Sequence, residues 1–137
     1  MRFLAIDYGD SRTGLALGDD VTGIVSPIEV LDLQNERLIA AVGKLMRKYE
    51  PDAVVIGLPL NMDGTEGPQV KKVRLFSDKI CHAFQIPLFF QDERLSSSAA
   101  EEKLAQRGLT HGGKKTRRDA LAACEFLDDF LKARRGH

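Results

Sequence analysis

Short apolar runs, separated by polar and glycine- or proline-containing segments, predict five strands in this chain. The runs cover residues 3–8, 13–19, 24–33, 53–58 and 87–91. The connections between the first three runs are short, so these strands are expected to form an antiparallel meander. Pro27 lies within the third run and indicates either an edge strand or a bulge.

Apolar residues at helical spacing predict helices over residues 35–49, 68–84, 97–107 and 117–134. Pro68 suits the first turn of the second helix, and a Gly- and Lys-rich loop is expected at residues 109–115. The resulting order is β-β-β-α-β-α-β-α-α. A meander followed by strand–helix crossovers predicts an α/β fold, with a mixed sheet covered by helices on both faces.

The chain has 137 residues, of which 43 % are hydrophobic and 29 % charged, and its formal net charge is zero. These values predict one globular domain over residues 1–137, with no global attraction to nucleic acid or to a membrane surface. No apolar run is long enough to cross a bilayer, and a cytoplasmic protein is expected. Cys81 and Cys124 are expected to be small buried residues in a reducing compartment.

Two of the predicted strands end in carboxylates. Asp7 closes the first apolar run, and Asp92 and Glu93 follow the last one. Ligand sites in open α/β sheets lie at the carboxyl ends of the strands, so these acids are candidates for a site. The alternatives are that Asp7 only binds the amides of the following turn, and that Asp92 and Glu93 lie in a solvated loop.

A third candidate carboxylate lies on the last predicted helix. Asp119 precedes Ala123 and Leu127 by four and eight residues, which places it on the stripe expected to face the core. The alternative is a capping box formed with Thr116, because acids also favour the start of a helix.

Asp7, Glu93 and Asp119 could therefore converge at one edge of the sheet. Carboxylate oxygens are the ligands that Mg²⁺ or Mn²⁺ would take there. Two such ions can activate water and stabilise the leaving oxygen in the hydrolysis of a phosphodiester. Without a cation, the clustered acids would raise one another's pKa values.

Further polar residues lie near the predicted edge. Arg12 follows Asp7 in a polar turn and could contact phosphate or pair with Asp10. Asn61 lies in the shaped loop 59–67, where it could bind substrate or hold the loop together.

The segment 111–118 is basic and could bind phosphates or simply form a solvated connection. Its basic residues are Lys114, Lys115, Arg117 and Arg118.

Four segments in order resemble one protein family, over residues 3 to about 131. They read DYGDSRTGLAL, VVIGLPLNMDGTEGPQ, DERLSSSAAE and RRDALAACEFLDDFL. This chain is similar to the YqgF/RuvX family of Holliday-junction-resolvase-like proteins, which are described as pre-16S rRNA nucleases. The resemblance implies an RNase H-like five-stranded sheet in the order 3-2-1-4-5, with Asp7, Glu93 and Asp119 as the metal-binding acidic triad.

The resemblance also implies a hydrolase that matures the 5′ end of 16S ribosomal RNA with two metal ions. Cleavage of four-way DNA junctions stays an alternative, and a resolvase would favour a homodimer over a monomer. Two other classes stay open at this point. One is an ATP-dependent phosphotransferase, which the length of the chain disfavours, and the other is a non-catalytic RNA-binding assembly factor.

Overall fold

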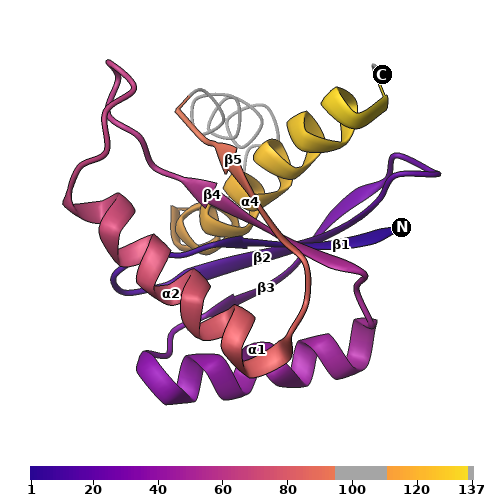
Figure 1. Cartoon of the computed structure of the whole chain (residues 1–137), viewed down its shortest axis with the longest axis horizontal. Coiled ribbons are helices and arrows are strands. Elements are labelled where there is room, and N and C mark those ends of the chain that lie inside the picture. Colours follow the sequence, from indigo (N-terminus) through magenta and orange to yellow (C-terminus); the bar gives the residue numbers. More distant parts are fainter. Residues whose placement is uncertain (95–110, 136–137) are drawn as a thin grey trace.

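The computed structural model describes the backbone of residues 1–94 and 111–135, and the side chains of residues 1–94 and 120–134. Its sheet has five strands in the order β3-β2-β1-β4-β5 (Figure 1). The strands are β1 (Arg2–Asp7), β2 (Thr13–Asp19), β3 (Val25–Leu31), β4 (Ala53–Leu58) and β5 (Leu88–Asp92). The predicted order and the antiparallel meander are confirmed, because β1–β2 and β2–β3 are antiparallel while β1–β4 and β4–β5 are parallel.

Helices cover both faces of the sheet, as the pattern predicted (Figure 1). On one face lie α1 (Asn35–Tyr49) and α2 (Pro68–Phe84), and on the other lies α4 (His111–Arg135). The bounds of α1 and α2 match the predicted helices. The predicted helix 97–107 lies outside the described residues.

The last helix begins earlier than predicted. A loop was expected at residues 109–115, but α4 is already helical from His111. The prediction gave decisive weight to Gly112 and Gly113, which cost about 1 kcal/mol each in a helix interior. The lysines and arginines that follow are good helix formers, and each residue added to an existing helix gains one hydrogen bond. The basic segment 111–118 is therefore part of a helix rather than a loop.

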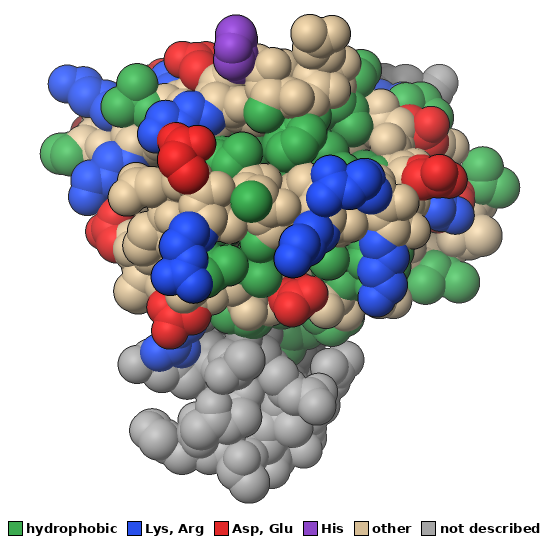
Figure 2. Space-filling model, turned by 90° about the horizontal axis from the view of Figure 1, so that it is seen from below, with side chains coloured by type: hydrophobic (Ala, Val, Ile, Leu, Met, Phe, Trp, Pro, Cys, Tyr) green, Lys and Arg blue, Asp and Glu red, His purple; other side chains and the backbone are tan. Residues whose placement is uncertain are grey.

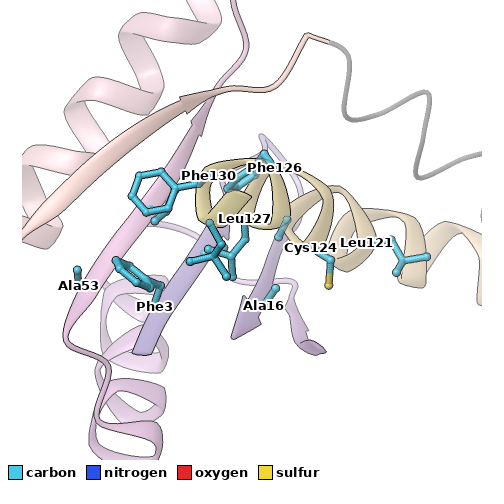
Figure 3. Packing of buried hydrophobic residues seen from close by; sticks show 12 residues of the cluster. Phe3, Ala16, Ala53, Leu121, Cys124, Phe126, Leu127 and Phe130 are labelled. Carbon is cyan, nitrogen blue, oxygen red and sulfur yellow. The ribbon is translucent and has the colours of Figure 1, made fainter. Parts of the chain in front are cut away.

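The core between α4 and the sheet is built from alternate strand residues and one stripe of the helix (Figure 3). Phe3 and Ala5 of β1 and Ala53 and Val55 of β4 contribute from the sheet. The ring of Phe3 meets Phe130 edge-on, with 5.4 Å between centroids. These contacts make the α4-facing surface of the sheet a closely packed apolar layer.

The two cysteines differ in their surroundings. Cys124 is buried within the α4 core, as predicted, but Cys81 is exposed, so that part of the prediction was wrong. The buried stripe of α2 passes through Phe76 and Ile80. Position 81 follows Ile80 by about 100° around the helix and so leaves the stripe.

Charges on the side of the molecule where α1 lies are mixed. Figure 2 shows lysine and arginine side chains spread over this side, with acidic and apolar side chains between them. This side therefore lacks the continuous basic stripe that would follow a phosphate backbone. Within the described part of the chain, no helix has the length and apolar character needed to cross a bilayer.

Strand β3 forms one edge of the sheet and contains Pro27, as predicted. Its pairing with β2 shifts register, because Leu15 faces Glu29 and the next residue, Ala16, faces Pro27. Ile28 is therefore the extra residue of a bulge. Both predicted alternatives for Pro27 apply, since it lies on an edge strand and next to a bulge.

Candidate metal-binding site at the carboxyl ends of the strands

Asp7 is the last residue of β1 and lies opposite Gly14 of β2. Side chains alternate along a strand, so Asp7 shares the α4-facing side of the sheet with Phe3 and Ala5. Its side chain is half-buried. The first candidate acid thus lies at the carboxyl end of a central strand, where the apolar layer under α4 ends.

Glu93 comes directly after β5, and its backbone N–H donates to the carbonyl oxygen of Leu58, at 3.2 Å. Its carboxyl group lies over Gly57 of β4. A Cβ atom at position 57 would overlap Oε2 of Glu93 and would lie 2.7 Å from Cε2 of Phe126. The absence of a side chain at Gly57 therefore provides the space that the carboxyl group of Glu93 occupies.

The carboxyl groups of Asp7 and Glu93 are in hydrogen-bonding contact, which in the absence of a cation requires a proton between them. Burial raises the pKa of Glu93 above its ordinary value. The hydrogen bond with Asp7 opposes this shift, and the negative charge of Asp92 adds to it. Among the described residues, no hydrogen-bond partner contacts the buried Oε2 atom of Glu93.

This arrangement fits a divalent cation. Asp7 and Glu93 are far apart in the sequence but meet at the carboxyl ends of the strands. Oε2 of Glu93 is buried there, and no described residue donates a hydrogen bond to it. An orphaned buried carboxylate oxygen is costly, and a hard cation is the partner that such oxygens bind best. Within the described side chains, no group of three or more acids, histidines or cysteines is placed to hold a metal ion.

Asp119 lies in α4, and its side chain falls outside the described residues. The direction of α4 nevertheless shows at which end of the sheet the residue lies. Phe126 contacts Gly57 near the carboxyl end of β4, whereas Arg134 lies over Phe3 and close to Met1, at the amino end of β1. The N-terminal part of α4 is therefore the part that lies toward the carboxyl ends of the strands. Residue 119 precedes Phe126 by about two turns of the helix.

Loop 59–67 follows β4 and is held by its own side chains. Asn61 Nδ2 donates to Oγ1 of Thr65 at 2.9 Å, and the Thr65 hydroxyl donates to Asp63 at 2.6 Å. This hydrogen bond fits the predicted role of Asn61 in holding the loop, and its contact with substrate stays a prediction. The hydrogen bonds from Thr65 also lower the pKa of Asp63.

The predicted phosphate-binding residues lie in two places. Arg12 is half-buried in the turn between β1 and β2, and nearby Asp10 forms an exposed ion pair with Lys72 at 3.1 Å. The other four are in the first turns of α4, with side chains outside the described residues: Lys114, Lys115, Arg117 and Arg118.

Two residues that shape this end of the sheet, Gly57 and Arg94, were not among the predicted site residues. A glycine inside a buried strand is a recognised sign that another group approaches the backbone closely, so the Gly57 contact was open to prediction. Arg94 gave no comparable signal, because its partners, Asp92 and the carbonyl oxygen of Met62, come together only in the folded chain.

Known structures with the same architecture place the chain in a class. The T. thermophilus RuvC in complex with a Holliday junction substrate is 15 % identical, with a TM-score of 0.64, and the alignment covers 99 % of this chain and 97 % of that one. The Fowlpox virus resolvase in complex with Holliday junction DNA is 12 % identical, with a TM-score of 0.60 and coverage of 97 % and 98 %. The fold is thus RuvC-like, within the RNase H-like class.

Sequence comparison then identifies the family. The family model "RuvX: Holliday junction resolvase" matches residues 1–133, and the chain belongs to this family. A relative from Anaeromyxobacter sp. (strain Fw109-5), named "Putative pre-16S rRNA nuclease", is 38 % identical over 135 residues and 98 % of both chains. A relative of the same name from Glaesserella parasuis serovar 5 is 34 % identical over 130 residues and 94 % of both chains. The predicted family is therefore confirmed.

Proposed function

We propose that the protein is a metal-dependent nuclease that hydrolyses phosphodiester bonds in pre-16S ribosomal RNA, at its 5′ end. The observation that carries this proposal is the pair of Asp7 and Glu93. The two carboxyl groups meet at the carboxyl ends of β1 and β5, and Oε2 of Glu93 is buried without a donor. The name of the relatives supports RNA as the substrate.

In this proposal Asp7, Glu93 and Asp119 hold Mg²⁺ or Mn²⁺. A bound divalent cation would supply a Lewis acid for the phosphate and lower the pKa of water. Gly57 leaves room for the Glu93 carboxyl, and the backbone bond from Glu93 to Leu58 fixes the residue against β4. The site is thus built on strand ends, which hold ligands more rigidly than loops do.

Affinity for the nucleic acid would come from local charge, since the whole chain is neutral. Arg12 lies in the turn that follows Asp7, and the basic first turns of α4 lead into Asp119. Contacts from these arginines and lysines to phosphate would place the backbone over the acids without reading its sequence.

The test is the variant Asp7→Asn, assayed on RNA carrying the 5′ extension of pre-16S rRNA, with Mg²⁺ or Mn²⁺. The control is Asp10→Asn, which changes a nearby acid that is exposed and paired with Lys72. We expect Asp7→Asn to lose cleavage by about 10²-fold or more and Asp10→Asn to keep it. Equal cleavage by Asp7→Asn and the parent protein would refute the proposal.

Cleavage of branched DNA is the second candidate, because the family model carries the description of a Holliday junction resolvase. The same variants should therefore be assayed on four-way DNA junctions. A junction has two-fold symmetry, so a resolvase is expected to act as a homodimer, whereas trimming of rRNA needs only a monomer. Preference for junctions together with a dimer in light scattering would replace RNA with branched DNA.

A non-catalytic assembly factor makes the opposite prediction in cells. If the protein only binds RNA, the Asp7→Asn variant should rescue a strain that lacks the gene. If the protein is a nuclease, the Asp7→Asn variant should fail to rescue this strain, even when the variant accumulates to the level of the parent protein.

A further inference from the structure

All three guanidinium nitrogens of Arg94 contact other residues of the protein. Its Nε and Nη2 atoms lie 2.8 and 2.6 Å from Oδ2 of Asp92, and its backbone N–H donates to Oδ1 of Asp92 at 3.0 Å. Its Nη1 atom donates to the carbonyl oxygen of Met62 at 3.2 Å. A guanidinium group in this geometry is held as a fork between two partners, which an ammonium group cannot reproduce.

These contacts join two segments that are distant in the sequence. Asp92 ends β5 and Met62 lies in loop 59–67, so Arg94 connects the loop to the strand that carries the next residue, Glu93. The backbone N–H of Glu93 donates a hydrogen bond to the carbonyl oxygen of Leu58, which comes just before the same loop. Two connections therefore hold loop 59–67 to the segment around Glu93. One is the side chain of Arg94, and the other is the backbone hydrogen bond from Glu93 to Leu58.

The joined segments form one wall of a cleft. A cavity of about 510 Å³ lies between Met62, the end of β5 and Asp129 of α4, and Asp92 and Arg94 line it. Met62 is 77 % exposed at the rim of this cleft. Asp92 and Arg94 flank Glu93 in the sequence, and a cleft of this volume has room for one nucleotide unit.

We propose that Arg94 is a positioning residue that fixes loop 59–67 as the wall of a substrate-binding cleft beside Glu93, with a nucleotide as the ligand. The proposal rests on the proposed nuclease function. Each guanidinium nitrogen of Arg94 faces Asp92 or Met62, so its role in this proposal is to hold the loop rather than to bind the substrate. It acts by keeping the loop and the Glu93 segment in one fixed relation.

The first measurement is hydrogen exchange of the loop amides in Arg94→Lys. Three amides of the loop report on its order: Asn61, Gly64 and Thr65. The matched control is Arg74→Lys, because Arg74 makes a similar fork with Glu66 at the other end of the loop, away from the cleft. We expect exchange to become about tenfold faster in Arg94→Lys around Met62, and the same in Asp92→Asn.

The second measurement is steady-state cleavage of the RNA substrate. A loosened wall should raise KM about tenfold in Arg94→Lys while kcat changes less than about threefold, because the acids themselves stay in place. Arg74→Lys should leave both constants near those of the parent protein. The double variant Asp92→Asn/Arg94→Lys should be no worse than either single variant, since both remove the same connection.

Unchanged loop exchange in Arg94→Lys, or a loosened loop with unchanged KM, would overturn the proposal. A fall in kcat with constant KM would also overturn it, because the residue would then act in the chemical step. If the parent protein cleaves neither RNA nor junctions, the proposed function fails instead. Loop exchange would in that case still decide whether Arg94 holds the loop.

Discussion

Glu93→Gln is expected to stabilise the metal-free protein at neutral pH while removing its cleavage activity. The substitution keeps the size of the side chain and removes its charge. In the folded protein burial raises the pKa of Glu93 above its ordinary value. The charged form is therefore disfavoured by folding, and a neutral amide avoids this cost.

The pH dependence has a definite sign. Below the ordinary pKa of a glutamate, the side chain is protonated in the folded and unfolded states, and the wild-type protein keeps its full stability. As the pH rises through the raised pKa of folded Glu93, that stability is lost. Glutamine does not titrate, so the advantage of the variant should be absent near pH 4 and grow toward pH 8.

The magnitude follows from the charge on the buried carboxylate. Burying a polar group without a partner costs about 1–3 kcal/mol, and more when the group is charged; glutamine removes this charge, and its amide can donate toward Asp7. A gain of about 1–2 kcal/mol corresponds to a rise in Tm of about 3–10 °C for a chain of this length. Thermal unfolding followed by circular dichroism, in EDTA at several pH values, measures this difference.

Addition of Mg²⁺ should narrow the difference, because an ion that binds only the folded protein at 100 times its Kd stabilises it by about 2.7 kcal/mol. The wild-type protein should gain this stability and Glu93→Gln should gain less. Glu29→Gln, which changes an exposed acid on β3, serves as the control and should alter neither quantity. A variant no more stable than the wild-type protein at pH 8, or an advantage independent of pH, would refute this reasoning.

Three other substitutions test the packing on the two faces of the sheet. Gly57→Ala should lower the free energy of unfolding by about 1–3 kcal/mol and reduce cleavage, because the added Cβ would collide with Glu93 and Phe126. Urea unfolding measures the stability, and the RNA assay measures the cleavage. Phe126→Ala should cost about 3–5 kcal/mol in the same urea experiment, because its ring is fully buried. Thr13→Val should raise the free energy of unfolding by about 1 kcal/mol in the same urea experiment and leave cleavage unchanged. The Thr13 hydroxyl is buried on the opposite face of the sheet, and no described residue bonds it.

The sheet could be predicted from the sequence because its determinants are local. Each apolar run is bounded by turn residues, and the short connections permit only an antiparallel meander for the first three strands. The start of α4 could not be predicted in the same way. Gly112 and Gly113 favour a loop locally, and the helix that contains them is stabilised by contacts of its distant C-terminal half with the sheet.

The candidate site divides in a similar way. Asp7 and Glu93 could be named from their positions at strand ends, and the structure brings these two together. The role of Asp119 stays a prediction that the direction of α4 favours. The contact of Arg94 with Met62 depends on how β5 and loop 59–67 meet, which no spacing in the sequence encodes.

Pro27 and its bulge bear on how copies of this protein meet one another. The edge of a sheet offers unpaired backbone groups on which another chain can add a strand. At β3 the proline supplies no N–H group, and the shifted register at Ile28 bends the strand locally. This edge is therefore a poor template for strand addition, which protects a concentrated solution of the protein from aggregation along β3. If the protein acts as a dimer on branched DNA, its subunits should associate through a surface other than this edge.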